Sequence, residues 1–440
     1  MLSLFGSLPY MYVNPFWPGI DLFSLFANSF LESSSGFTTT GLSTIIHPED
    51  LSDSFSFYRS YTLWVGGLSF VYLVMALYYP ETKLAGIMHL LGGGILRFKQ
   101  LLSTISVIFA IYTAIIALLI FFFGHVNVLN SISLGFATLS SGGFVPTSTI
   151  LNVENPFTLI VIMGGMIIAA LPFAFHFGIF SKNVEATKEL KEVLLFIILL
   201  IFFIFLFIFI ESSYSEKEWI TSMFHVISAS TTTGFQFIDL SHLSIYGKIL
   251  LIVVMLVGGT AFSTAGGIKI ARLLLIFEKL INNKKYASTF NEKNAPSLPP
   301  IISATAIQFR KRIQQSFKSY NQGKEVEKIN KQMTCEVPLD KYKFNILSDK
   351  AFREALFVVV LFILFTVITA LCIYYLDRNN HSFINTVFET ASTISNTGLS
   401  AGITTMDLDS VSKMILSFNM IMGRFEIIAI LYIFISKLRR

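Results

Sequence analysis

Four short turns of this chain combine hydroxyl side chains with a glycine, a pairing suited to binding a dehydrated monovalent cation. The turns are Thr38-Thr39-Thr40-Gly41, Ser140-Ser141-Gly142-Gly143, Thr231-Thr232-Thr233-Gly234 and Ser395-Asn396-Thr397-Gly398. A cation that loses its water needs several oxygen ligands, which backbone carbonyls supply when successive residues adopt left-handed φ angles. Glycine reaches those angles without a Cβ penalty. We therefore expect the four turns to form one selectivity filter, and we call them the filter turns.

The columns around the four glycines also agree. The residue after each glycine is apolar, and a hydroxyl lies three residues before it, on Thr38, Ser140, Thr231 and Ser395. These hydroxyls would add a lower ring of oxygens to the filter. Only the first and third turns read Thr-Thr-Thr-Gly, so we expect an asymmetric filter with fewer strict binding positions than four identical turns would build.

The composition indicates an integral membrane protein. The 440 residues are 53% hydrophobic and only 13% charged, whereas soluble domains carry about 25% charged residues. Apolar runs long enough to span a bilayer recur, for example at residues 194–210 and 356–374. The two cysteines, Cys335 and Cys372, support no disulfide, zinc site or thiol nucleophile. We expect a multi-pass, all-α protein that contacts membrane lipid and binds no nucleic acid.

The basic residues indicate which way the filter turns face. Half of the 32 Lys and Arg residues fall between Arg272 and Arg353, and smaller clusters lie around Lys83, around Lys188 and at the C-terminus. Each cluster follows one turn and precedes the next, or ends the chain. Because basic loops stay on the cytoplasmic side, the turns should open toward the opposite face.

Around each turn the hydropathy predicts a spanning helix, a short helix, the turn and a second spanning helix, which in the second repeat covers residues 157–180. Short helices that stop at membrane depth require surrounding protein or a water-filled cavity, and four units around one axis would provide both. The predicted fold is therefore four pseudo-repeated helix–pore-loop–helix units around a central ion pore. The predicted repeats are residues 1–85, 86–185, 186–280 and 351–440, with a cytoplasmic insert at residues 281–350.

The first repeat departs from this plan. Only residues 1–12 precede its short helix, which the sequence places at residues 19–36, and they are too few to span a membrane. We therefore expect an N-terminally truncated first repeat whose first helix is mostly missing. A misplaced start codon and a truncated gene would each explain it.

A glycine-rich loop, residues 258–267, interrupts the second helix of the third repeat. Its glycines and hydroxyl residues break a spanning helix beneath the expected filter and permit a hinge, although small residues also form plain helix-packing faces. Arg424 is a charge within the last span, where charges are functional by default; its alternative role is an ion pair with Glu426. The residues expected to gate the pore are Gly258, Gly259, Ser263, Thr264, Gly266, Gly267, Lys269 and Arg424.

Acidic side chains occur outside and behind the filter turns. Those that follow the turns are Glu49, Asp50, Asp53, Glu154, Asp239, Asp407 and Asp409. They would concentrate cations at the outer mouth, or they are ordinary polar loop residues. Glu32 and Glu389 lie nine residues before their glycines, as His225 does in the third repeat. No nucleophile and base accompany them, so we expect no enzyme and assign them to hydrogen bonds behind the filter.

With these motifs placed, the chain resembles the Trk/Ktr/HKT superfamily of potassium transporters, and most closely its bacterial TrkH branch. The resemblance rests on the four filter turns and on the glycine-rich loop, in which Ala261, Phe262 and Ala265 stand where the family usually has smaller or more polar residues. It implies potassium uptake across the bacterial cytoplasmic (inner) membrane, with potassium bound at the filter residues and no cofactor in this chain. It also implies a homodimer and a cytoplasmic nucleotide-binding regulatory subunit of the TrkA kind.

Two other functions remain open at this point. A secondary transporter of another solute can also be built from repeats with broken helices, although four breaks in one register favour a pore. The short first repeat raises a further possibility, a truncated remnant that transports nothing.

Overall fold

The computed structural model describes residues 1–78, 96–151, 155–173, 175–176, 187–211, 216–282, 341–377 and 381–425. These residues form helices and connecting loops without a strand. Three of the helices are long and apolar enough to cross a membrane, at Leu102–Gly124, Leu190–Ile210 and Phe352–Leu376. The prediction of an all-α membrane protein is confirmed. The chain divides into two compact units, Met1–Leu273 with Val359–Glu426 and Leu274–Val358 with Ile427–Arg440, and the filter turns belong to the first.

Four short helices, which we call the pore helices, each end at a filter turn. They are α2 (Leu22–Phe37), α6 (Val128–Leu139), α10 (Glu216–Ser230) and α15 (Phe383–Ile394). Before them come α1 (Leu2–Val13), α5 (Leu96–Gly124), α9 (Thr187–Ile210) and α14 (Lys341–Leu376). After them come α3 (Asp53–Tyr78), α7 (Pro156–Ala170), α11 (Ile245–Val257) and α16 (Ser410–Arg424). Side chains of Asp21, Asn127 and Ser382 cap the first turns of three pore helices, which fixes where these helices begin.

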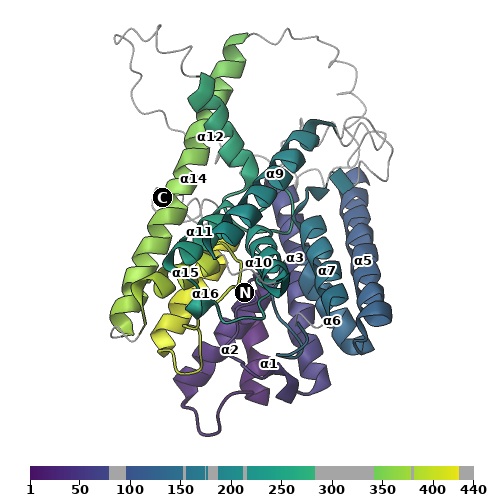
Figure 1. Cartoon of the computed structure of the whole chain (residues 1–440), viewed down its shortest axis with the longest axis vertical. Helices are drawn as coiled ribbons and strands as arrows, with labels where there is room; N and C mark the ends of the chain where they lie inside the picture. Colours follow the sequence, from purple (N-terminus) through teal and green to yellow (C-terminus); the bar gives the residue numbers. More distant parts are fainter. Residues whose placement is uncertain are drawn as a thin grey trace, which may run out of the picture. The chain divides into compact units, whose positions relative to one another are not determined.

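The helix that follows each filter turn packs against the pore helix of the next repeat. The contacts are α3 with α6, α7 with α10, α11 with α15 and α16 with α2. The last contact joins the two ends of the first unit, so that α16 (yellow) meets α2 (purple) in Figure 1. The four pore helices are therefore arranged in a closed ring.

Two helices are interrupted where the chain must turn at membrane depth. After α11 the chain leaves the helix at Gly258 and resumes as α12 (Ile270–Asn282), which agrees with the predicted break. The prediction of one continuous helix over residues 157–180 was wrong, because α7 ends at Ala170. Pro172 lacks an N–H group and forces Leu171 into an extended conformation, with φ −83° and ψ 153°.

The start of the chain forms a helix that sequence reasoning did not predict. Helix α1 packs along α2, as α5 packs along α6 (Figure 1). Tyr10 is fully buried and lies edge-on to Phe55, with ring centroids 4.9 Å apart. Ser33 Oγ donates a hydrogen bond to the Ser3 carbonyl at 2.7 Å. These contacts place α1 beside the first pore helix.

The predicted insert is only partly described. Helix α14 begins at Lys341, inside the segment interpreted as a cytoplasmic insert, and residues 283–340 lie outside the described part of the chain. Within the second unit, Lys279 Nζ lies 4.7 Å from the centroid of the Phe352 ring.

We expect Tyr10→Ala to destabilise the protein by about 3 kcal/mol, because it leaves a cavity between α1 and α3. The measurement is the melting temperature of the purified protein in detergent. Tyr12→Ala is the matched control, since Tyr12 lies on the same helix and is 92% exposed. Equal losses of melting temperature in the two variants would contradict the packing of α1.

Candidate ion-conduction site

Each pore helix ends in the same hydrogen-bonded turn. The residue two before the filter glycine has a φ of 51° to 55° in all four turns: Thr39, Ser141, Thr232 and Asn396. Its N–H donates to the carbonyl three residues earlier at 3.0–3.3 Å, and the next N–H donates to the carbonyl five residues earlier at 2.8–2.9 Å. These are the two bonds of a Schellman motif. Glycine normally takes the left-handed position, so four residues with side chains there store backbone strain at the filter.

The four filter glycines face one another around a closed circle. A Cβ on Gly41 would meet the backbone of Gly143, and a Cβ on Gly143 would meet that of Gly234. A Cβ on Gly234 would meet the Thr397 carbonyl, and one on Gly398 would meet the Thr40 carbonyl in the first turn. Three of the glycines, all except Gly143, also have φ angles of 81° to 92°. Only glycine fits this ring, and it leaves bare backbone around one axis.

The hydroxyls three residues before the glycines are bonded to their own helices. Each donates to the carbonyl four residues earlier at 2.6–2.7 Å: Thr38, Ser140, Thr231 and Ser395. In three turns this hydroxyl also pairs with the one just before the glycine, as in Thr38–Thr40, Thr231–Thr233 and Ser395–Thr397. The second turn lacks such a pair, because Gly142 stands in that position. The hydroxyl protons are thus donated to carbonyls of the pore helices. Only the oxygen lone pairs of this ring would be free to bind a cation.

Polar side chains hold three of the turns from behind. The side chain nine residues before the filter glycine accepts a hydrogen bond from the backbone N–H three residues after that glycine. The pairs are Glu32 with Thr44 at 2.6 Å, His225 with Phe237 at 3.4 Å and Glu389 with Ala401 at 2.9 Å. In the second repeat this position is Leu134. The two carboxylates therefore support the filter loops, as the sequence suggested.

The glycine-rich loop is hydrogen-bonded to three of the four filter turns. Thr264 Oγ1 lies 2.8 Å from Ser141 Oγ, Gly266 N–H donates to Thr232 Oγ1 at 2.5 Å, and Gly267 N–H donates to the Ser395 carbonyl at 3.1 Å. In place of a loop contact at the first turn, Asn396 Nδ2 donates to Thr40 Oγ1 at 3.0 Å. In the second and third turns the side chain in the strained left-handed position, Ser141 or Thr232, holds the loop against the filter, whereas the fourth turn does so through a backbone carbonyl.

The same loop fills the break at the end of α7. The Ala170 carbonyl accepts from both the N–H and the hydroxyl of Thr260, at 3.2 and 2.6 Å. Thr264 Oγ1 bonds to the Ala169 carbonyl at 3.0 Å, and Phe173 N–H donates to the Phe262 carbonyl at 3.1 Å. The carbonyls and the N–H that Pro172 releases from helical bonding are therefore satisfied by the loop.

Both basic residues singled out in the sequence contact the loop. Arg424 Nη1 donates to the Thr264 carbonyl at 3.0 Å, and its Cζ lies 3.9 Å from the centroid of the Phe70 ring. Lys269 Nζ donates to the Ala265 carbonyl and lies 5.7 Å from the same ring centroid. Arg424 is buried, and its Nε and Nη2 have no hydrogen-bond partner among the described residues. Glu426, its alternative partner, lies outside them.

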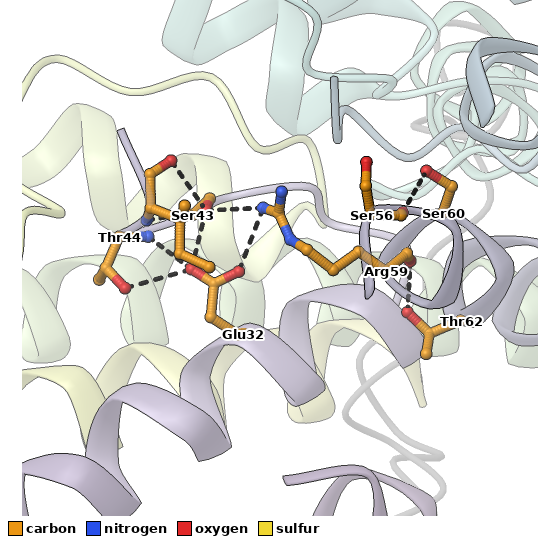
Figure 2. A network of polar contacts seen from close by, with 8 residues as sticks. Glu32, Ser43, Thr44, Ser56, Arg59, Ser60 and Thr62 are labelled. Carbon is orange, nitrogen blue, oxygen red and sulfur yellow. Dashed lines mark hydrogen bonds and ion pairs between the residues drawn. The ribbon is translucent and has the colours of Figure 1, made fainter. Parts of the chain in front are cut away.

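Three further buried basic residues were missed: Arg59, Lys248 and Lys413. Lys248 and Lys413 each occupy the fourth position of their helix, and each Nζ donates to the carbonyl seven residues earlier, at 2.6 and 2.7 Å. Arg59 Nη2 donates to Ser43 Oγ at 2.9 Å and lies 3.3 Å from Glu32 Oε2 (Figure 2). A charge inside a spanning segment was the signal that could have identified all three.

Several outer acidic residues make local hydrogen bonds. Asp239 caps η3 (Leu240–His242), and Asp409 caps α16. Glu49 accepts from the N–H and the hydroxyl of Ser148, at 2.9 and 2.8 Å, which links the outer loops of the first two repeats. Burial alone would raise the pKa of Glu49, but these hydrogen bonds outweigh it and set the pKa at about 2. Glu49 therefore stays charged at neutral pH, whereas Glu154 lies outside the described residues.

The known proteins that resemble this chain are cation transporters. Residues 22–439 match the TrkH family model, described as a cation transport protein. An uncharacterized cation transporter of Methanocaldococcus jannaschii is 28% identical over 435 residues, which cover 96% of this chain and 78% of that protein. The Trk system potassium uptake protein TrkH of Escherichia coli is 26% identical over 295 residues, covering 63% of this chain and 59% of that protein. The crystal structure of the potassium transporter TrkH from Vibrio parahaemolyticus has the same fold, with a TM-score of 0.69 at 21% identity over 98% of this chain and 82% of that one.

Gly398→Ala should weaken the binding of potassium by about tenfold or more, because its Cβ would push against the Thr40 carbonyl and open the ring. The measurement is the potassium concentration that half-protects the protein against thermal unfolding. Gly402→Ala is the control, since Gly402 has a similar φ of 84° but its Cβ would meet nothing closer than 3.9 Å. Equal potassium protection in both variants would contradict the ring as the binding site.

Proposed function

This chain belongs to the TrkH family of cation transport proteins, and we propose that it takes up potassium across a bacterial cytoplasmic membrane through the pore of the four filter turns. The family identity confirms that the chain is not an enzyme. The single observation that carries the proposal is the closed ring of glycines, in which each Cβ position is occupied by the next repeat's backbone. The names of the Escherichia coli and Vibrio parahaemolyticus relatives supply potassium as the ion.

The pore helices create a negative potential that favours a cation at the filter. Each ends at a filter turn with its C-terminus, which carries roughly half a negative charge. Carbonyl oxygens of the turns replace the water of the ion, and hydroxyl lone pairs add ligands below them. The ion binds most firmly where the turns are alike and less firmly at the positions of Gly142 and Asn396, which depart from the Thr-Thr-Thr-Gly pattern.

We assign the glycine-rich loop as the gate of this pore, in a closed position against the filter turns. It is supported there by bonds to Ser141, Thr232 and Ser395 and by the broken end of α7. Arg424 adds a positive charge beside the loop, which opposes cation flow while the loop is in place. Opening requires the loop to leave these partners.

A regulatory subunit acts on this gate. The Escherichia coli relative is named as a protein of a Trk system, and we assign this chain a cytoplasmic nucleotide-binding partner of the TrkA kind and a homodimeric state.

Expression of this chain together with its regulatory subunit, in a bacterium that lacks its own potassium-uptake systems, tests the function. We expect growth at limiting potassium and accumulation of rubidium, with Gly398→Ala protein in the membrane as the inactive control. Absence of rubidium uptake, with the protein present in the membrane, would overturn the assignment. Uptake of an organic solute without dependence on cations would favour a secondary transporter instead.

Thr264→Val should raise rubidium flux through the closed pore by about tenfold, because valine keeps the shape but loses the bonds to Ser141, Leu139 and Ala169. Flux is measured in proteoliposomes without any regulatory subunit. Thr366→Val is the matched control, since its buried hydroxyl bonds only to its own helix, at the Phe362 carbonyl. A Thr264→Val flux no higher than that of the control would show that the loop is not the gate.

A further inference from the structure

We propose that Arg59, acting with Glu32, is a specificity-determining residue that fixes the spacing between the first and second filter turns. The inference rests on the proposed function, because it concerns which cation the same filter accepts. It assigns the pair a positioning role, since neither side chain is a ligand of the ion.

The pair is buried, and its hydrogen bonds lie on the side of the first turn. Glu32 is 0% exposed and Arg59 only 3% exposed. Glu32 Oε1 accepts from Thr44 N–H at 2.6 Å, from Thr44 Oγ1 at 3.1 Å and from Ser43 Oγ at 2.8 Å. Arg59 Nη2 bonds to the other carboxylate oxygen and to Ser43 Oγ, so that the two charges grip the segment just after Gly41 (Figure 2).

The same guanidinium reaches the second turn. Its Cζ lies 4.4 Å from the centroid of the Phe144 ring, within the range of a cation–π contact. Phe144 directly follows Gly143 and is 2% exposed. One side chain therefore touches the segments that leave two neighbouring filter glycines.

The second turn needs outside support more than the others. It lacks the hydroxyl pair that cross-links the first, third and fourth turns, because Gly142 replaces the second hydroxyl residue. A Cβ on Gly142 would meet Leu63, which lies on α3 one turn beyond Arg59. Helix α3 thus supports the second turn at two points, through Leu63 packing and through Arg59.

No other described boundary between repeats has a buried ion pair. Lys248 Nζ on α11 also reaches the pore helix of the next repeat, but its partner there is the uncharged Asn385 Oδ1, at 2.8 Å. Glu389 in the fourth repeat accepts hydrogen bonds from Ser400, Ala401 and Thr404 and has no cationic partner among the described residues. Lys413 of the same repeat donates to a backbone carbonyl instead. A buried ion pair is often no more stabilising than an apolar pair of the same size, so stability alone does not account for it. The position of the ion pair between two filter turns accounts for it instead.

The test uses four proteins in proteoliposomes: wild type, Glu32→Gln, Arg59→Met and the double variant. Melting temperature and the preference for potassium over sodium in flux are measured on each. The single variants should melt lower, because each leaves a buried charge unpaired. The double variant should recover the melting temperature. Its potassium preference should be lower by about tenfold, because the contacts of Arg59 with the segments after both turns are lost.

Recovery of both properties in the double variant would overturn the inference, because a merely structural pair would be restored by neutralising both partners. Tyr58→Phe is the matched control: Tyr58 is the neighbour of Arg59, but its hydroxyl bonds to the Gly6 carbonyl in α1, away from the filter. It should keep the wild-type preference. Absence of potassium flux in the wild type would instead refute the proposed function itself, and the inference with it.

Discussion

Close contact between the backbones of four glycines is the constraint on which the rest of this structure depends. Each glycine stands where the next repeat leaves no room for a Cβ, so the four turns can be brought together only as a complete ring. The residue two positions before each glycine has a strained left-handed conformation, which the hydrogen bonds of the Schellman motif stabilise. The helix after each turn then wedges against the next pore helix, which encloses the polar backbone in protein.

Below the ring, two broken helices complete each other. The end of α7 exposes carbonyls, and the glycine-rich loop between α11 and α12 supplies the donors that bind them. Hydrogen bonds of this kind contribute about 1 kcal/mol each, so a handful of them hold the loop by an amount that a bound partner can overcome. A loop held by complementary breaks is therefore both ordered and releasable, as the proposed gate requires.

The sequence predicted the parts that repeat and the glycine-rich loop, but it missed several other parts that do not repeat. The register of Gly41, Gly143, Gly234 and Gly398 was readable because the same columns recur. The break at Pro172 was not predicted, since it lies in an apolar run that hydropathy alone extends. Arg59 was missed because its partners come from a pore helix and from two loops far apart in the chain. Contacts such as Thr264 with Ser141 exist only once the ring has closed, and no local pattern encodes them.

We propose that the four filter turns surround one potassium site. Anomalous diffraction from crystals of the protein grown with rubidium in place of potassium tests it most directly. We expect a rubidium peak on the axis of the ring, encircled by backbone oxygens from all four turns. Rubidium bound elsewhere in the protein, with no peak between the glycines, would contradict it.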